Sequence, residues 1–346
     1  MYSSLKSAQL DYLARNELPA APAAGEFSAR ADGSVDTLPP LAGTASCALT
    51  LEQDIGTLWV HLEPDCAVKF TPDVLFDLRT AQAGIAARLR AQAGHAPAQR
   101  IRYQVFASRI PGVFSLGGDL ELFRECICER DERRLRSYAR DAVDLVYVNA
   151  TAYEEPVTTI SLVQGQALGG GFEAALAAHV IVAERGSRMG LPEIMFNMFP
   201  GMGAYQLLSR RLTPAQAERM ILSGRTYTAE ELHALGVVDV LAEHGEGERT
   251  VRRHIQAIDR QCHGRQGLRR ALHAAAPLDR HELYRMADVW VETALGLGAR
   301  DLDTIDYLLR AQQRMSGQVN TRLAAVPSRV DAVPGAPSAA ELLMEA

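Results

Sequence analysis

Residues 163–173 read Val-Gln-Gly-Gln-Ala-Leu-Gly-Gly-Gly-Phe-Glu, where three consecutive glycines precede an alanine-rich segment. The run 158–165, TTISLVQG, is typical of a buried strand, and residues 170–178 have a helical pattern. A glycine-rich turn between a strand and a helix favours an α/β fold. Glycine also lets backbone amides approach a ligand, because no Cβ atom stands in the way.

Strand-like and helix-like segments alternate on both sides of this turn. The expected strands are 57–64, 101–108, 158–165, 179–184 and 237–242, and the expected helices are 72–93, 119–150, 170–178 and 203–211. Two more helix starts have capping-box sequences, at Thr213-Pro-Ala-Gln216 and Thr228-Ala-Glu-Glu231. Residues 248–316 have an almost purely helical pattern. We therefore expect an α/β core followed by a helical subdomain.

Composition divides the chain into four parts. Residues 1–45 and 319–346 are rich in Ala, Pro and Gly and have little hydrophobic periodicity, so we expect a flexible N-terminal extension and a flexible tail. Between them, we expect the catalytic core at 46–247 and the C-terminal helical subdomain at 248–318.

Charge and cysteine content exclude several classes of protein. The net charge is −6 and no long basic run is present, which argues against a nucleic-acid partner. No apolar stretch is long enough for a membrane span, and the N-terminus lacks the apolar core of a signal peptide, so we expect a cytoplasmic protein. The five cysteines form no C-x-x-C pair, and Cys126 and Cys128 should face different directions on a helix. We expect reduced thiols and no metal site.

Two more glycine-rich segments accompany the first, Phe114-Ser-Leu-Gly-Gly-Asp-Leu120 and Met189-Gly-Leu-Pro-Glu-Ile194, the latter followed by Phe199-Pro-Gly-Met-Gly203. Taken singly, such glycines are usually turns, and a glutamate in a first helical turn is usually solvated. Together they suggest chemistry. Two glycine loops can offer amides to a developing oxyanion, and two glutamates in apolar surroundings can divide the work of acid and base.

In their order along the chain, these three segments resemble the motifs of the crotonase (enoyl-CoA hydratase) superfamily. Glu173 and Glu193 are 20 residues apart, as in the two-glutamate hydratases of that family. The resemblance covers about residues 55–245 and implies a crotonase-like ββα spiral core that acts on acyl thioesters.

The resemblance also implies the site residues. Glu173 and Glu193 would be catalytic, and the backbone amides of Leu116 and Gly170 would form the oxyanion hole around the thioester carbonyl. No metal and no separate cofactor is expected, because the substrate brings its own carrier, either acyl carrier protein or CoA. The family also implies a homo-oligomer, a trimer or a pair of trimers.

The sequence departs from ordinary hydratases where many of them have an Asn-Arg-Pro-like loop next to the CoA nucleotide, since it reads HLEPDCAVKF at 61–70. Residues 189–212 and 286–298 instead resemble the diffusible-signal-factor synthases, which make cis-2-unsaturated fatty-acid quorum-sensing signals. That subgroup dehydrates a 3-hydroxyacyl chain on acyl carrier protein and then hydrolyses the thioester. A sensor protein that restrains the synthase is a further candidate partner in the subgroup.

Several alternatives stay open at this stage. Trp290 and Leu308 match subgroup positions around the acyl chain, but ordinary core packing explains them equally well. Arg265, Arg269 and Arg270 could receive an acidic carrier protein, although a solvated helix face is the more common explanation. The main alternative function is an enoyl-CoA hydratase of fatty-acid oxidation, and the second is a non-catalytic binding module. Acyl chain length and double-bond geometry are not encoded in these motifs.

Overall fold

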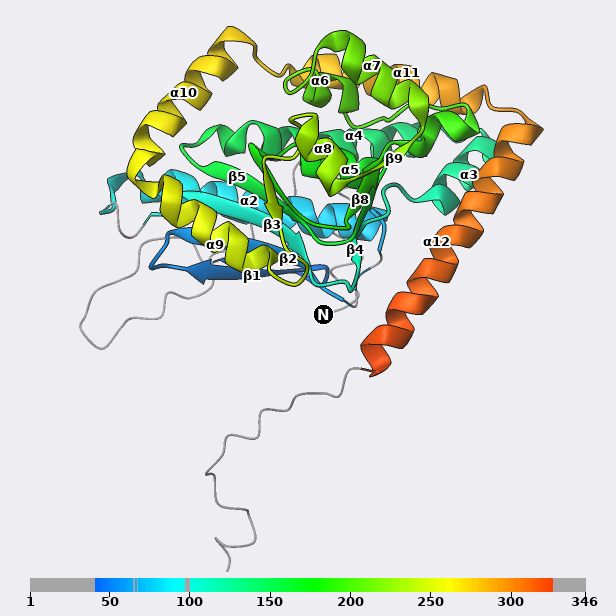
Figure 1. Ribbon diagram of the computed structural model, residues 1–346. Coiled ribbons are helices and arrows are strands. Elements are labelled where there is room, and N and C mark those ends of the chain that lie inside the picture. Colours follow the sequence, from blue (N-terminus) through cyan, green and yellow to red (C-terminus); the bar gives the residue numbers. More distant parts are fainter. Residues whose placement is uncertain (1–40, 65, 67, 97–99, 326–346) are drawn as a thin grey trace, which may run out of the picture.

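The computed structural model describes residues 41–325 apart from 65, 67 and 97–99, and shows two sheets surrounded by helices (Figure 1). The expected N-terminal extension lies almost wholly outside the described residues, as does most of the expected tail. The main sheet is parallel except for its first pair of strands. Its order is β1 (Cys47–Glu52), β2 (Thr57–Leu62), β3 (Tyr103–Ser108), β5 (Thr158–Val163), β7 (Val180–Glu184) and β10 (Val240–Ala242).

The chain also forms a second, smaller sheet, whose strands lie in sequence between strands of the main sheet and the helices that follow them. Its order is β4 (Val113–Ser115), β6 (Gln166–Leu168), β8 (Arg188–Gly190) and β9 (Thr226–Thr228). Each of β3, β5 and β7 is followed by one of these short strands and then by a helix, which gives a repeated ββα unit. The expected α/β fold with a ββα core is confirmed.

The helices pack around these sheets and above them (Figure 1). In chain order they are α2 (Pro72–Ala91), α3 (Leu120–Glu129), α4 (Glu132–Ala150), α5 (Gly170–Leu176), α6 (Ala204–Leu208), α7 (Pro214–Ser223), α8 (Ala229–Ala234), α9 (Gly247–Ile258), α10 (Cys262–Ala275), α11 (Arg280–Leu295) and α12 (Ala299–Ala325), with short 3₁₀ turns η1 (Gln92–Gly94), η3 (Ala152–Glu154), η4 (Pro192–Phe196) and η5 (Asp259–Gln261). Both expected capping boxes form, at the starts of α7 and α8.

The single helix expected over 119–150 is wrong. The chain forms α3 and α4 instead, because Arg130 takes a left-handed conformation (φ 53°) and ends α3. Asp131 then caps α4 by accepting a hydrogen bond from the amide of Arg134 at 3.0 Å. As expected, Cys126 and Cys128 on α3 face different directions, one buried and one exposed.

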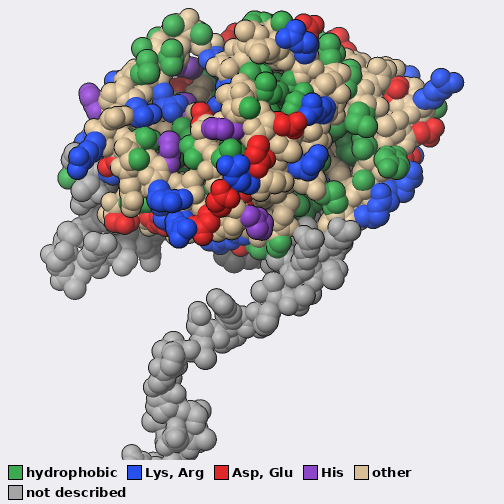
Figure 2. Space-filling model, in the orientation of Figure 1, with side chains coloured by type: hydrophobic (Ala, Val, Ile, Leu, Met, Phe, Trp, Pro, Cys, Tyr) green, Lys and Arg blue, Asp and Glu red, His purple; other side chains and the backbone are tan. Residues whose placement is uncertain are grey.

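Helices α9 to α12 form the expected C-terminal helical region. Helix α12 continues to Ala325, beyond the boundary expected at 318, and runs down one edge of the molecule (Figure 1). It packs against α3 and η4. Charged side chains of both signs are interspersed over the face drawn in Figure 2. No helix in the described part of the chain is long and apolar enough to cross a membrane.

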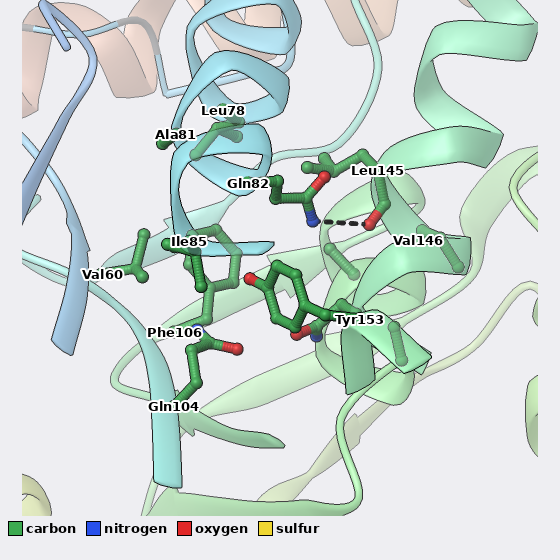
Figure 3. A pocket seen from close by; sticks show the side chains of 13 residues that line it. Val60, Leu78, Ala81, Gln82, Ile85, Gln104, Phe106, Leu145, Val146 and Tyr153 are labelled. Carbon is green, nitrogen blue, oxygen red and sulfur yellow. Dashed lines mark hydrogen bonds between the residues drawn. The ribbon is translucent and has the colours of Figure 1, made fainter. Parts of the chain in front are cut away.

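The core between α2, α4 and the main sheet holds an apolar cavity (Figure 3). The side-chain amide of Gln82 donates to the carbonyl of Leu145 at 3.0 Å and joins α2 to α4 across it. The buried guanidinium of Arg79 pairs with Asp141 and Asp144 on the same helix α4. These paired charges fix the helix that forms one wall of the candidate site described next.

Candidate active site

A pocket with an empty volume of about 430 Å³ opens at the N-terminal end of α5. It brings together all three glycine-rich segments, together with α3, α4 and α11. Its lining residues are Gly118, Phe123, Tyr138, Ala139, Ala142, Gly170, Glu173, Glu193, Phe196, Gly201, Met202 and Trp290. Both glutamates that the sequence singled out therefore lie in one pocket.

Glu173 is in the first turn of α5 and is almost completely buried, with 1% of its surface exposed. Its Oε1 atom accepts hydrogen bonds from the amides of Met202 at 2.7 Å and Ala204 at 2.9 Å. Burial raises the pKa of this carboxyl to about 7, and the two donated hydrogen bonds partly oppose that rise. The side chain is thus held in one orientation while keeping a proton affinity suited to neutral pH.

Glu193 is in the first turn of η4, and its Oε2 atom is buried with no hydrogen-bond partner among the described residues. Burial, and then the charge of Glu173, raise the pKa of this carboxyl to about 8. The two carboxyls interact, so ionisation of one disfavours ionisation of the other, and the pair titrates as a unit. One member can then accept a proton while the other donates.

The prediction that the Leu116 amide is an oxyanion donor is wrong. Its amide already donates to the carbonyl of Val68 at 2.7 Å, so it has no hydrogen left for a substrate. The amide nitrogen of Gly118, two residues further on, lies near Gly170 instead. A Cβ atom added to Gly170 would lie 3.6 Å from the nitrogen of Gly118, in the space between the two segments.

Gly118 and Gly170 form the candidate oxyanion hole. Neither amide donates to another residue in the part of the chain that the structure describes. Gly170 is the first residue of α5, where helical amides have no partner within the helix. Gly118 precedes Asp119, the cap of α3, so its amide also lies near a helix start. That cap position is the sequence signal that could have identified Gly118.

Aromatic side chains close one wall of the pocket. Trp290 on α11 packs edge-to-face on Phe123 of α3, with 4.9 Å between ring centroids. Its indole also lies where a Cβ atom on Gly201 would stand. Trp290 therefore lies in the pocket, whereas Leu308 on α12 is partly buried against the core and is not among the lining residues. An apolar wall of this kind suits a hydrocarbon chain.

The arginines considered for carrier-protein binding lie elsewhere, on α10. Arg265 and Arg270 are exposed, and Arg265 donates to Gln261 one turn earlier. Arg269 is partly buried, and burial lowers its pKa to about 10. None of the three lines the glutamate pocket. Over the described residues, no group of three or more His, Cys, Asp or Glu side chains is placed to hold a metal ion.

Comparison with known proteins identifies the family. The family model described as "Enoyl-CoA hydratase/isomerase" matches residues 83–293, more than half of the chain. The chain belongs to the enoyl-CoA hydratase/isomerase family. The matched range includes α3, α4, both glutamates, both glycines of the candidate oxyanion hole and Trp290.

Individual curated relatives match a shorter part of the chain than the family model does. The human mitochondrial enoyl-CoA hydratase domain-containing protein 2 is 35% identical over 160 residues, which are 45% of this chain and 51% of that protein. The chain thus spans about half the length of the curated relatives it matches.

Solved structures of similar fold include an enoyl-CoA hydratase from Bacillus halodurans (TM-score 0.61, 20% identity, 77% of this chain and 100% of that one). DspI from Pseudomonas aeruginosa is another (TM-score 0.52, 23% identity, 68% of this chain and 82% of that one). At such identities these two likenesses concern the fold alone.

Proposed function

We propose that this chain catalyses the dehydration of a 3-hydroxyacyl thioester. One observation carries the proposal: a buried glutamate and a partly buried one, both with raised pKa values, line the same pocket as two backbone amides that donate to no other described residue. A carboxylate and a carboxylic acid are what elimination of water from a thioester needs, and the amides can stabilise the enolate oxygen.

In this scheme one glutamate, as carboxylate, removes the proton from Cα. The electron pair moves onto the thioester oxygen, which accepts hydrogen bonds from the amides of Gly118 and Gly170. When the carbonyl re-forms, the C2–C3 double bond forms and the C3–O bond breaks. The departing hydroxyl takes a proton from the other glutamic acid and leaves as water. Hydration is the same sequence in reverse.

We further propose that the enzyme releases its product as a free acid. A water molecule deprotonated by one of the carboxylates attacks the thioester carbonyl, and the same two amides stabilise the tetrahedral oxyanion. The carbon–sulfur bond then breaks, and the thiolate of the carrier takes up a proton. No serine or cysteine nucleophile is required for this route.

The proposed product is a 2-unsaturated fatty-acid quorum-sensing signal made from 3-hydroxyacyl-acyl carrier protein. Residues 189–212 and 286–298, which resemble the diffusible-signal-factor synthases, contribute Glu193 and the aromatic wall around Trp290. Acyl carrier protein is the proposed donor of the chain, and a homo-oligomer and a restraining sensor protein are the proposed partners. The second candidate is an enoyl-CoA hydratase of fatty-acid oxidation, which family membership and the names of the relatives favour.

The experiment is to incubate the purified protein with a 3-hydroxyacyl-acyl carrier protein and, separately, with the matching CoA thioester. Products are identified by mass spectrometry, with the Glu173→Gln/Glu193→Gln double variant as control. The proposal expects a free 2-unsaturated acid from the carrier protein and slower turnover of the CoA thioester. Rapid interconversion of enoyl-CoA and 3-hydroxyacyl-CoA without free acid would instead establish the hydratase.

A further inference from the structure

We propose that Gln312, on α12, is a positioning residue that holds the segment 116–118 so that the Gly118 amide faces the thioester oxygen. The proposal rests on the oxyanion role of Gly118 described above. Gln312 is 196 residues away in sequence, yet its side-chain Nε2 donates to the carbonyl of Leu116 at 3.0 Å. The same nitrogen makes a longer and weaker hydrogen bond to the carbonyl oxygen of Gly118, at 3.4 Å.

The segment needs external support because two of its three residues are glycines. Gly117 has a φ of +86°, a conformation that glycine adopts without strain, and neither glycine has a side chain that could pack against the core. An oxyanion donor is useful only if its direction is fixed before the reaction. The orientation of the Gly118 amide must therefore come from hydrogen bonds to the backbone of the segment.

On the core side, three hydrogen bonds hold the segment. The Leu116 amide donates to Val68, the Phe70 amide donates to the Gly117 carbonyl at 2.8 Å, and the Gly117 amide donates to Ser115 Oγ at 3.2 Å. The remaining carbonyls, of Leu116 and Gly118, are the two that Gln312 reaches. They belong to the peptide groups on either side of the one that contains the Gly118 nitrogen, so fixing both restricts its rotation.

Helix α12 is anchored well enough for this role. Arg124 on α3 forms an ion pair with Asp306 on α12, and Met315, three residues beyond Gln312, packs partly against the core. The helix contacts both α3 and η4, the elements that follow Gly118 and contain Glu193. Helix α12 thus reaches the candidate oxyanion hole through the side chain of Gln312.

The test uses Gln312→Met, which keeps the side-chain length and removes the donor, with Gln313→Met on the exposed neighbouring position as matched control. We expect Gln312→Met to lower kcat about 10-fold with KM and thermal stability unchanged, less than the ~10²–10³-fold loss typical of deleting a donor. Hydrogen exchange at residues 115–119 should speed up in Gln312→Met and not in Gln313→Met.

Gln312→Glu adds a readout that a packing role would not change. Its carboxylate would face two carbonyl oxygens, whereas its protonated form can donate again. Its kcat relative to wild type should therefore recover as the pH falls. Unchanged kcat and unchanged exchange in Gln312→Met would overturn the proposal. If Gly170→Val also leaves activity unchanged, the oxyanion role itself fails; if Gly170→Val inactivates and Gln312→Met does not, only the role of Gln312 fails.

Discussion

Gly169 and Glu193 are in direct contact, so close that a Cβ atom added to Gly169 would collide with the Oε1 atom of the carboxylate. Gly169 precedes α5 with φ 52° and ψ −126°, a conformation that other residues rarely adopt. Its amide donates to the carbonyl of Gly190 at 2.8 Å. The turn that presents the Gly170 amide therefore also sets the position of the second glutamate.

Replacing Gly169 by alanine should displace the Glu193 carboxylate and lower kcat by about 10²-fold, the contribution of a general acid–base group. Steady-state kinetics would measure the loss, alongside thermal unfolding to establish that the variant is folded. Gly84→Ala on α2 is the matched control, because nothing lies within 4 Å of the added methyl group. Normal turnover in folded Gly169→Ala would argue against a role for Glu193.

The two glutamates should behave as one unit. Glu173→Gln keeps an oxygen that can accept hydrogen bonds from the amides of Met202 and Ala204. The orientation of the side chain should therefore survive, while its ability to transfer a proton is lost. We expect Glu173→Gln and Glu193→Gln each to reduce kcat by about 10²–10⁴-fold. The double variant should be little worse than the single ones, whereas independent sites would give multiplied losses.

Blocking the candidate oxyanion hole should be as damaging as removing a carboxylate. The Cβ atom of Gly170→Val would lie 2.7 Å from the Met202 sulfur, which can move, and 3.6 Å from the Gly118 nitrogen. We expect kcat to fall by about 10²-fold or more, in line with loss of one donor. Activity within a few-fold of wild type in a stable Gly170→Val protein would place the thioester elsewhere.

The buried carboxyls should also make stability depend on pH. Burial raises the pKa of Glu193 from 4.5 to about 8, so the folded state binds its proton more tightly than the unfolded state does. The free energy of unfolding should then fall as the pH rises from about 4.5 to about 8. Glu193→Gln, which has no charge to bury, should be more stable than wild type at pH 8 and similar at pH 5.

Urea unfolding at pH 5 and pH 8, at one protein concentration, would measure this difference. We expect Glu193→Gln to unfold at a higher urea concentration than wild type at pH 8 and at a similar concentration at pH 5. Equal stability of Glu193→Gln and wild type at both pH values would show that burial does not raise the pKa of this carboxyl.

Five of the six strands of the main sheet were predictable, because they are rich in apolar and β-branched residues. The edge strand β1 (Cys47–Glu52) was missed. The second sheet was missed, because strands of three residues such as Val113–Ser115 are too short to show a period. The break between α3 and α4 was also missed. It depends on the left-handed conformation of one residue, Arg130, and an arginine in a sequence gives no signal of that conformation.

Within the site, the sequence identified Glu173, Glu193 and Gly170 but placed the first oxyanion donor at Leu116. The direction of an amide depends on the backbone path, and the hydrogen bond from Leu116 to Val68 is invisible in a motif. Gln312 was missed for a related reason. Its contacts with Leu116 and Gly118 join segments that come together only in the folded chain.

The most direct test of the central claim is turnover of 3-hydroxyacyl-acyl carrier protein in water enriched in oxygen-18, with products analysed by mass spectrometry. Hydrolysis at the glutamate pocket predicts a free 2-unsaturated acid that carries the label in its carboxyl group. Both the acid and the label should be lost in Glu193→Gln. An intact thioester labelled only at C3, with no free acid, would contradict the proposed release of a free acid and would indicate a reversible hydratase instead.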